Sequence, residues 1–383
     1  RRNENGGLVI YLDNAATTYP KPIGVAASLI KSLVDPFGNA GRGGHSAAMH
    51  AADCVYEARR ALSDLFGLSD ERRVVFSKNA TESLNIALFG LLSKQRDARV
   101  VTSTLEHNSV LRPLYELARR GCIRLDFFEP SAEDEVSFKR FVRAMEQGAY
   151  LVAVSACANT TGQRLPIRRI CEYAHSRGAL TVVDAAQAAG SVDLSMADVN
   201  ADYLCFPAHK GLYGIMGLGA LLIAEHAPCP DPVLFGGAGV DSAAREMPTD
   251  LPERLEAGTV NAHAAAALLG GVDYLRLHGI DSLRKKEEGL ALALREGLIE
   301  LGARVFSPEE STIVLFDLDS FEPEEVALRL DEAGICVRAG LHCAPLAHRS
   351  LGTFPLGAVR ASFGAFNTAS EVEETLACLR KIR

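Results

Sequence analysis

A lysine and an aspartate at the ends of two strand-like runs are the residues of this chain best suited to chemistry. Lys210 closes the run Asp202-Tyr-Leu-Cys-Phe-Pro-Ala-His-Lys210, and Asp184 closes Leu180-Thr-Val-Val-Asp184. A lysine amine forms a Schiff base with an aldehyde, and a carboxylate holds a pyridinium nitrogen protonated so that the ring accepts electrons. The pair therefore indicates a pyridoxal phosphate site. Taken alone, each residue is commoner as a solvated charge or a turn former.

Further polar residues follow other strand-like runs, where they could hold an anion or a flat ring. Asn79 and Glu82 fit a capping box, and the free N–H groups of that helix start suit a phosphate together with the Thr81 hydroxyl. His107 could stack on a ring, and Asn159 could donate a hydrogen bond to a carboxylate or a ring oxygen. A plain helix cap, a solvated histidine and a turn asparagine are the ordinary alternatives.

Two residues nearer the C-terminus could bind and attack a substrate. Arg360 lies in an apolar strand-like run and needs a partner, which is either a substrate carboxylate or an internal acid. Cys343 lies between two histidines in the Gly- and Pro-containing loop 340–348, five residues after Arg338. Cationic or polarising neighbours favour the nucleophilic thiolate. We therefore expect Cys343 to be a reactive thiol on a flexible loop instead of a buried structural cysteine.

The elements that position these residues alternate between strands and helices. From about residue 70 to 225, seven short apolar runs are separated by segments with apolar residues at three- and four-residue spacing. This pattern predicts an α/β fold with a mostly parallel seven-stranded sheet buried on both faces. Ligands of such sheets bind beyond the carboxyl ends of the strands, which is where the polar residues above fall.

A long polar loop at 240–256 is followed by a different pattern. Two helices precede a strand–helix–strand alternation, which predicts a smaller α+β unit. We therefore expect a large domain at 20–258, and a small domain formed by 1–19 and 259–383 that carries the Cys343 loop.

The bulk composition narrows the class of protein. The 383 residues are 48% hydrophobic with a net charge of −8, and no basic cluster suggests nucleic acid as a partner. No apolar run has membrane-spanning length, and the polar N-terminus lacks a signal-peptide core, so we expect a cytoplasmic protein. Nine cysteines without a Cys-x-x-Cys pair argue against a disulfide framework and against a metal site.

The order and spacing of these motifs resemble the cysteine desulfurases, pyridoxal phosphate enzymes of fold type I in the class V aminotransferase superfamily, and within them the group II, SufS-like branch. The similarity covers essentially the whole chain, from Tyr11-Leu-Asp-Asn14-Ala-Ala-Thr-Thr18 through Asn39-Ala-Gly-Arg42-Gly-Gly-His45 to Arg360-Ala-Ser-Phe-Gly-Ala-Phe-Asn367. It implies that L-cysteine is converted to L-alanine, with the sulfur passed to an enzyme persulfide and then to an acceptor protein.

The resemblance also implies a role for each matching residue. Lys210 carries the Schiff base and moves the proton at the substrate Cα, His107 stacks on the ring, and Cys343 attacks the substrate sulfur. The implied cofactor ligands are Ala80, Thr81, His107, Asn159, Asp184, Gln187, His209, Lys210 and Thr259. Thr259 is expected to reach the site of the neighbouring subunit in a homodimer. The implied substrate ligands are Asn14, Asn159, Arg338 and Arg360.

One position departs from the family pattern, and other activities stay open. Relatives usually carry Ser or Thr two residues before the pair His209-Lys210, whereas Pro207 offers neither a hydroxyl nor an N–H, which predicts a weaker phosphate site. Selenocysteine lyase, another C–S lyase and an aminotransferase are alternatives with the same cofactor. A scaffold or sulfur-relay protein without cofactor is an alternative from another class. The sulfur acceptor is also open, between iron–sulfur cluster assembly, a selenium pathway and another thiolation route.

Overall fold

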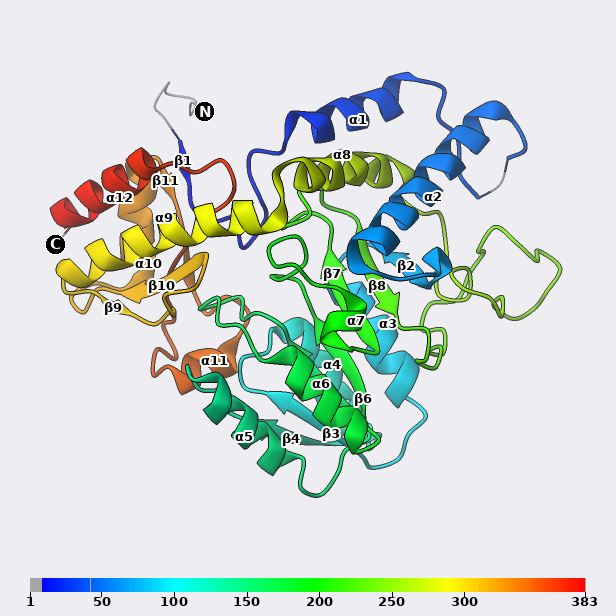
Figure 1. The fold of residues 1–383 in the computed structure, drawn as a ribbon, viewed down its shortest axis with the longest axis horizontal. Helices are drawn as coiled ribbons and strands as arrows, with labels where there is room; N and C mark the ends of the chain where they lie inside the picture. The colour runs from blue at the N-terminus through cyan, green and yellow to red at the C-terminus, as the bar shows by residue number, and fades with distance from the viewer. Residues whose placement is uncertain (1–8, 42, 383) are drawn as a thin grey trace.

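A computed structural model describes residues 9–41 and 43–382 (Figure 1). The N-terminal part of the predicted small domain before residue 9, and Arg42 of the motif near residue 40, lie outside the described residues.

A seven-stranded sheet forms the centre of the larger part of the molecule, in the order β2-β8-β7-β6-β5-β3-β4. Its strands are β2 (Val74–Ser77), β3 (Ala98–Ser103), β4 (Ile123–Phe128), β5 (Leu151–Ser155), β6 (Leu180–Asp184), β7 (Tyr203–Pro207) and β8 (Gly219–Ile223). Neighbours pair in parallel, except that β8 runs antiparallel to both β2 and β7. The predicted mostly parallel seven-stranded sheet is confirmed.

Helices enclose this sheet, so that consecutive residues of its central strands are buried whichever face they point to. Every residue of β5, β7 and β8 is buried, which is why these strands read as continuous apolar runs. The surrounding helices are α1 (Ile23–Val34), α2 (Ser46–Phe66), α3 (Ala80–Leu92), α4 (Asn108–Arg119), α5 (Asp134–Ala144), α6 (Ile167–Ser176), α7 (Met196–Val199) and α8 (Ala262–His278), with a 3₁₀ turn η1 (Glu71–Arg73) before β2.

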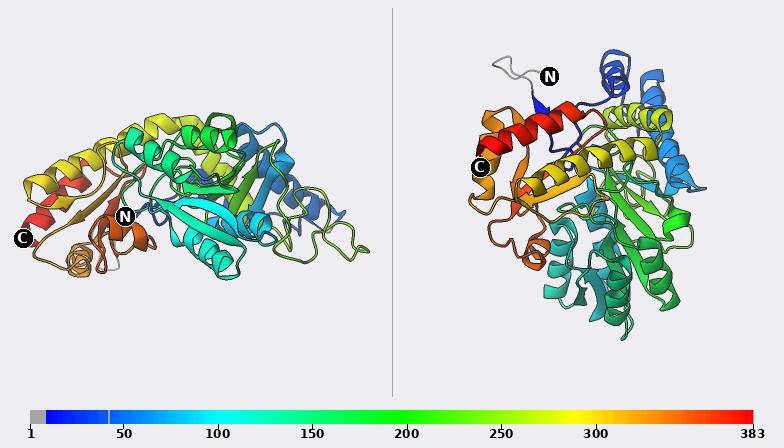
Figure 2. Two further views of the ribbon diagram at one scale, coloured as in Figure 1. Left: turned by 90° about the horizontal axis from the view of Figure 1, so that it is seen from below. Right: turned by 60° about the vertical axis from the view of Figure 1, so that its left-hand side comes forward.

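The smaller part is built on a four-stranded antiparallel sheet in the order β12-β13-β10-β9. Its strands are β9 (Arg304–Val305), β10 (Ile313–Asp317), β12 (Arg338–Gly340) and β13 (Ala358–Ser362). The pair β1 (Ile10–Tyr11) and β11 (Ile335–Cys336) adds a separate parallel ribbon. The helices here are α9 (Ile280–Glu300), α10 (Pro323–Glu332), α11 (Pro345–Ser350) and α12 (Ala369–Ile382). As Figures 1 and 2 show, α9 runs from the end of α8 out to this part.

The side-chain packing divides the chain at a different place from the sequence-based boundary. Ala264, Leu268 and Val272 of α8 pack in the larger core, although the sequence assigned this helix to the small domain. The reason is that α8 is apolar around much of its surface and packs against α1 and α2. Ala344 and Ala347, next to Cys343, also pack in the larger core, so the C-terminal part reaches back onto the sheet.

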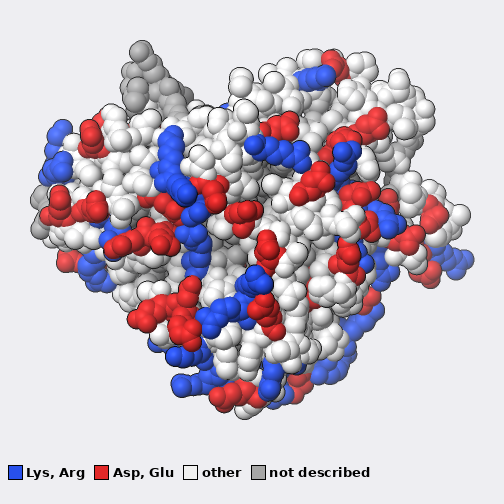
Figure 3. Space-filling view, viewed as in Figure 1, with Lys and Arg blue, Asp and Glu red and all other residues white. Residues whose placement is uncertain are grey.

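Charged side chains of both signs are interspersed over the face shown in Figure 3. Such a mixed surface favours solubility more than binding to a polyanion. In the part of the chain that the structure describes, no helix is both long and apolar enough to cross a bilayer.

Packing of α1 against α8 yields a test of the fold with a matched control. A Cβ on Gly270 would lie 2.6 Å from the backbone of Gly24, whereas one on Gly289 in α9 would meet no atom within 4 Å. We expect Gly270→Ala to lower the free energy of unfolding by about 1–3 kcal/mol. Gly289→Ala should raise it by about 0.5–1 kcal/mol, through helix propensity. Urea unfolding measures both changes, and equal stability of the two variants would contradict the close α1–α8 contact.

Candidate active site

The carboxyl ends of the parallel strands border a cavity of about 120 Å³. This is the edge at which sheets of this kind bind ligands. Eight of the nine predicted cofactor residues line the cavity: Ala80, Thr81, His107, Asn159, Asp184, Gln187, His209 and Lys210. Residues from five separate segments of sequence thus meet at one place.

Lys210 and Asp184 lie at this edge, where burial acts on both charges. Asp184 ends β6, is 5% exposed, and accepts a hydrogen bond at Oδ1 from Ala186 N at 2.9 Å. Burial raises the pKa of the Asp184 carboxyl, opposed by that hydrogen bond and by Lys210. Burial lowers the pKa of Lys210 to about 8, although Asp184 acts to raise it. A substantial fraction of the amine is therefore unprotonated near neutral pH, as a nucleophilic or proton-accepting lysine requires.

His107 is held as a neutral ring at the start of α4. Its Nδ1 accepts a hydrogen bond from Ser109 N at 3.0 Å, and Ser109 Oγ lies 2.9 Å from Nδ1 and 2.8 Å from Thr81 Oγ1. Burial, together with the charge of Lys210, lowers the pKa of His107 to about 4. Because Nδ1 is an acceptor, the proton is assigned to Nε2. A neutral ring fixed in this way suits stacking on a flat aromatic ligand.

The phosphate site predicted from the sequence lies at the start of α3. Asn79 caps the helix, with Oδ1 accepting from Glu82 N at 2.9 Å, and Glu82 Oε2 accepts from Lys78 N at 2.5 Å. The carboxylate thus reaches one residue beyond the N-cap N–H that a capping box would use. The first N–H groups of a helix have no partner within it. Since Ala80 and Thr81 both line the cavity, this end can bind an anion.

Three other cavity residues differ in the hydrogen bonds that their side chains make or could offer to a ligand. Gln187 Nε2 donates to Ala15 O at 2.9 Å. His209 Nδ1 is buried without a hydrogen-bond partner, and burial lowers the pKa of this histidine to about 4. Pro207 is buried at the end of β7 and lines the cavity, so this position gives an anion no donor.

Of the two partners that the sequence left open for Arg360, the structure shows the internal acid. It is 2% exposed on β13, with Nη2 paired to Asp13 Oδ1 at 2.9 Å and Nη1 donating to Asn159 O at 2.8 Å. The internal ion pair is therefore present. The Nε atom of Arg360 and Oδ1 of Asn159 nevertheless remain buried without partners. Unmade hydrogen bonds of this kind are costly, which makes both atoms candidates for contact with a ligand.

The loop that carries Cys343 is docked against the cavity through its backbone. Asn159 Nδ2 donates to His342 O at 2.6 Å, and Asn108 N donates to Cys343 O at 2.7 Å. His342 and Cys343 have φ angles of 49° and 58°, in the left-handed region that is costly for side chains other than glycine. The two hydrogen bonds therefore hold a strained turn. Cys343 is exposed, and the flexibility of its loop stays a prediction from the sequence.

The histidines flanking Cys343 do not supply the cationic surroundings that the sequence suggested. His342 Nδ1 lies 3.2 Å from His348 Nε2, and His342 Nε2 lies 3.2 Å from Arg338 O. His348 Nδ1 lies 2.7 Å from Thr353 Oγ1. Burial lowers the pKa values of His342 and His348 to about 2 and about 4. Both rings are therefore neutral, and they brace the loop through hydrogen bonds to each other and to its ends.

Arg338 is the cation that remains near this loop. It lies on β12, paired in register with Arg360 of β13, and it is exposed. Its charge contributes to the lowered pKa of His107 and of Lys210. The structure thus brings Arg338 to the same edge as the cavity, although it does not line the cavity.

Asn14 lines a small cavity together with Gln187 and Lys210, and its contact with substrate stays a prediction. Its Nδ2 donates to Ser362 O at 3.0 Å and to Asn367 Oδ1 at 3.2 Å, and its Oδ1 accepts from Tyr19 N at 3.2 Å. The side chain is buried and its amide hydrogens are engaged within the protein. This arrangement gives Asn14 a structural task, tying the N-terminal segment to β13.

Sequence reasoning gave no role to Glu106, Cys157 or Asp13, which the structure brings to the site. Glu106 is fully buried and accepts from Ser155 N and Ser155 Oγ, and burial raises its pKa to about 7. Cys157 lines the cavity, where burial raises the pKa of its thiol to about 12, so it stays protonated. An acid at a buried strand end was the one signal that could have identified Glu106.

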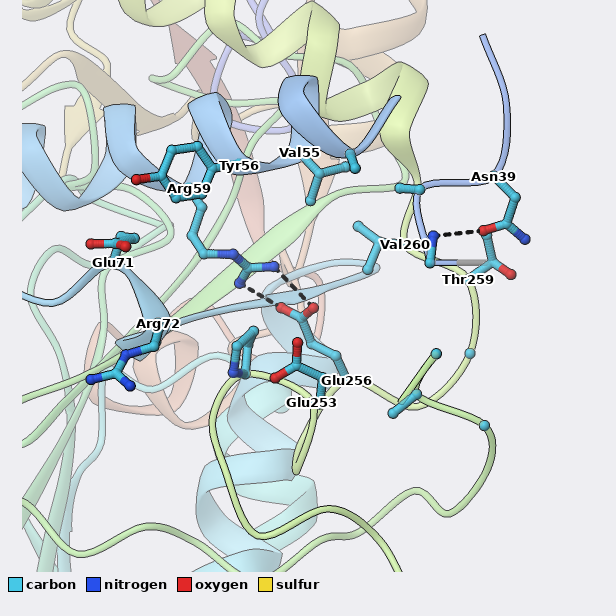
Figure 4. A pocket seen from close by; sticks show the side chains of 18 residues that line it. Asn39, Val55, Tyr56, Arg59, Glu71, Arg72, Glu253, Glu256, Thr259 and Val260 are labelled. Carbon is cyan, nitrogen blue, oxygen red and sulfur yellow. Dashed lines mark hydrogen bonds and ion pairs between the residues drawn. The ribbon is translucent and has the colours of Figure 1, made fainter. Parts of the chain in front are cut away.

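Thr259 lies apart from this cavity. It is exposed and lines a second cavity of about 300 Å³, beside α2 and the loop that precedes α8 (Figure 4). At the side of this cavity, Arg59 and Glu256 form a buried ion pair, with Nη1–Oε1 at 2.8 Å and Nη2–Oε2 at 3.0 Å. The pair anchors the end of the loop to α2, as Figure 4 shows.

Comparison with known proteins agrees with this geometry. The family model described as Aminotransferase class-V matches residues 10–375. A probable cysteine desulfurase of Pyrococcus abyssi is 34% identical, covering 98% of this chain and 94% of its own. The apo structure of a cysteine desulfurase from Thermococcus onnurineus NA1 has a TM-score of 0.90 at 33% identity, covering 98% and 94% of the two chains. The cysteine desulfurase CsdA of Escherichia coli has a TM-score of 0.88 at 26% identity, covering 97% and 94%.

The fold and the cavity define an enzyme of the type I fold of pyridoxal phosphate proteins. The chain belongs to the class V aminotransferase family, and the relatives it resembles there are cysteine desulfurases. The predicted fold class and family are confirmed.

The environment of Lys210 predicts how the apoenzyme captures pyridoxal phosphate at different pH values. Only the unprotonated amine attacks an aldehyde, and burial lowers the Lys210 pKa to about 8. The capture rate should therefore rise with pH through a midpoint near 8, where an unperturbed lysine would give a midpoint above 10. Asp184→Asn removes a charge that raises this pKa, so its midpoint should lie lower. Stopped-flow absorbance measures the rate, and a midpoint that does not move in Asp184→Asn would contradict the assignment.

Proposed function

We propose that the protein is a cysteine desulfurase that converts L-cysteine to L-alanine and takes up the sulfur on Cys343. The observation that carries this proposal is the position of that thiol. Cys343 is exposed, and its carbonyl is held by the N–H of the residue that follows His107, a residue of the Lys210 cavity. An aminotransferase or a simple lyase has no need for a docked nucleophile there.

Pyridoxal phosphate fits the residues of the cavity on grounds that do not depend on the family. His209 Nδ1 and Asn159 Oδ1 are buried polar atoms without partners, and the start of α3 offers Ala80 and Thr81 for a phosphate. In this proposal Asp184 would hold the ring nitrogen and His107 would stack on the ring, both of them residues that line the cavity. When bound, this group supplies an acceptor for the electrons released at the substrate Cα.

Lys210 serves two purposes in this scheme. Its lowered pKa leaves the amine free to attach the cofactor aldehyde. The same amine would accept the proton from the substrate Cα and later return a proton to the product. Burial favours this exchange because it brings the pKa of the amine close to neutral pH.

Arg360 binds the substrate carboxylate. Its unpartnered Nε is a buried donor at the cavity edge, and a guanidinium offers further N–H groups to a carboxylate. Asp13 keeps the guanidinium in place through the 2.9 Å ion pair, and Asn159 O holds it on the other side. Arg338, paired in register with Arg360, adds positive charge that attracts the anionic end of an amino acid.

Cys343 then acts on the substrate sulfur. A bond forms between Cys343 Sγ and the substrate sulfur, while the bond between that sulfur and the substrate Cβ breaks. The bonding electron pair stays with the carbon, which takes up a proton and leaves as alanine. The sulfur remains on the enzyme as a persulfide, which a thiol of an acceptor protein removes. Exposure of Cys343 allows such an acceptor to approach.

We further propose that the active unit is a homodimer in which Thr259 completes the neighbouring site. The support is the exposure of Thr259 in a cavity separate from Lys210. The helix α1 also exposes four large apolar side chains, Ile23, Ile30, Leu33 and Val34, at 86%, 58%, 63% and 73%, and clustered apolar surface of this kind marks interfaces. A cytoplasmic location and supply of sulfur for iron–sulfur cluster assembly stay predictions from the sequence.

An assay of alanine and sulfide formation tests the role of Cys343. We expect Cys343→Ala to lose more than about 100-fold of the activity with L-cysteine, because the nucleophile is gone. Cofactor absorbance should be unchanged, because Cys343 does not line the cofactor cavity. Cys229→Ala, which removes another exposed thiol, is the matched control and should keep full activity. Equal turnover by Cys343→Ala and wild type would show a lyase that does not depend on this thiol.

Mixed dimers test the role of Thr259. Lys210→Ala dimers should be inactive, and Thr259→Ala dimers should bind pyridoxal phosphate about tenfold more weakly, since one hydrogen bond to a charged group is lost. After subunit exchange, a mixed dimer contains one site with both wild-type residues. At limiting cofactor, the mixture should therefore exceed the activity of either parent. If activity only averages between the parents, Thr259 does not act across subunits.

A further inference from the structure

Two histidines and an aspartate meet on the side of the large sheet opposite the active site. His175 lies at the end of α6, Asp202 directly precedes β7, and His226 follows β8. The active-site cavity lies beyond the other end of β7, at Lys210. Because β8 runs antiparallel to β7, the end of β8 returns the chain to the start of β7. The cluster therefore joins three segments that are far apart in sequence.

The ligand atoms of this cluster are close together. His175 Nε2 lies 2.9 Å from Asp202 Oδ2, and His226 Nε2 lies 2.9 Å from Asp202 Oδ1. All three ligand atoms lie within 4.8 Å of one another. The two contacts show that both Nε2 atoms point at the same carboxylate. The planes of the two imidazole rings make an angle of 88°, and their centroids lie 5.8 Å apart.

Neighbouring groups fix the orientation of these side chains. Asp202 is 3% exposed, and its Oδ2 also accepts from Thr181 N at 2.7 Å and from Thr181 Oγ1 at 2.9 Å. Asn200 Nδ2 lies 3.3 Å from His175 Nδ1. Metal ligands are commonly held in this way by hydrogen bonds from a second layer of residues. The carboxylate is preorganised, whereas the His226 side chain is 59% exposed and gives access from solvent.

We propose that His175, Asp202 and His226 form a binding site for a divalent transition metal ion of the zinc type. Imidazole nitrogen with carboxylate oxygen is a ligand set for zinc, and bond lengths of 2.0–2.1 Å in a tetrahedron place ligand atoms about 3.3 Å apart. The two 2.9 Å contacts, one to each carboxylate oxygen, need to open by a few tenths of an ångström. Any wider ligand separation, which is at most 4.8 Å, needs to close, and the mostly exposed His226 side chain is able to move. The fourth position, beside the exposed His226, is taken by water.

The protons of the cluster can be accounted for when the metal binds. Because the carboxylate oxygens are acceptors, the hydrogen of each ring that faces Asp202 is assigned to Nε2 when no metal is bound. With metal, each Nε2 lone pair binds the ion, and the hydrogen of each neutral ring moves to Nδ1 through solvent exchange. The Asn200 amide turns so that its oxygen accepts from His175 Nδ1, an exchange of amide oxygen and nitrogen that costs no other contact among the hydrogen bonds described for this side chain.

The site links α6 to the ends of β7 and β8, so a bound ion stabilises the folded chain without entering the reaction. We expected no metal site from the sequence because no Cys-x-x-Cys pair is present. His175 and His226 lie 27 and 24 residues from Asp202, so no short motif marks this cluster. The pairing of β7 with β8 brings His226 to Asp202, and the packing of α6 on β6, which pairs with β7, brings His175 there.

Zinc binding by the holoenzyme tests this proposal. Free zinc is buffered at about 1 µM with a chromophoric chelator, and bound zinc per chain is counted for wild type, His226→Gln, His175→Gln and His278→Gln. His278 is an exposed histidine elsewhere, so His278→Gln is the matched control, and zinc bound by the thiols is common to all four proteins. Wild type and His278→Gln should bind one zinc per chain more than the other two variants. Zinc should also raise the melting temperature of wild type and His278→Gln, but not that of His226→Gln.

Equal zinc stoichiometry in all four proteins would overturn the proposal and leave the cluster as a set of hydrogen bonds. A difference that appears only at about millimolar free zinc would overturn it as well, because binding that weak does not require a built site. Since His226 is mostly exposed, its variant should fold normally, and the result does not depend on the more buried His175.

Discussion

Burial of an amine and a carboxylate at one edge of the sheet is the constraint on which the active site depends. Charged groups are costly in a low-dielectric interior, and here burial raises the pKa of Asp184 and lowers that of Lys210 to about 8. The parallel strands make this possible because β6 and β7 end side by side, with the Asp184 backbone in register with Cys205. The fold thus sets both the position and the basicity of the reactive lysine.

The C-terminal part of the chain completes the site by reaching across to this edge. Arg360 on β13 is tied to Asn159 of the large part and to Asp13 of the N-terminal segment. The Cys343 loop is held by Asn159 and Asn108. Asn159 therefore couples Arg360 to the loop with Cys343. In the proposed reaction, this coupling gives a physical reason for one asparagine to matter to both substrate binding and sulfur transfer.

The sequence was informative where local pattern determines structure. Continuous apolar runs predicted the strands, and polar residues at their ends predicted the cavity, because strand ends of a parallel sheet converge. Contacts between distant segments were not predictable in this way. The pair Asp13–Arg360, the neutral His342–His348 pair and the network around Asn14 all depend on tertiary packing. The same reason explains why the sequence assigned α8 to the small domain, although its side chains pack in the larger core.

Detection of the transferred sulfur tests the central claim most directly. Wild-type enzyme is incubated briefly with L-cysteine without acceptor, its thiols are alkylated, and its peptides are mapped by mass spectrometry. The account predicts one additional sulfur atom on the peptide containing Cys343 and none on the peptide containing Cys157, whose thiol lines the cavity but is kept protonated by burial. Alanine formation without sulfur on Cys343, or with sulfur on Cys157 instead, would contradict it.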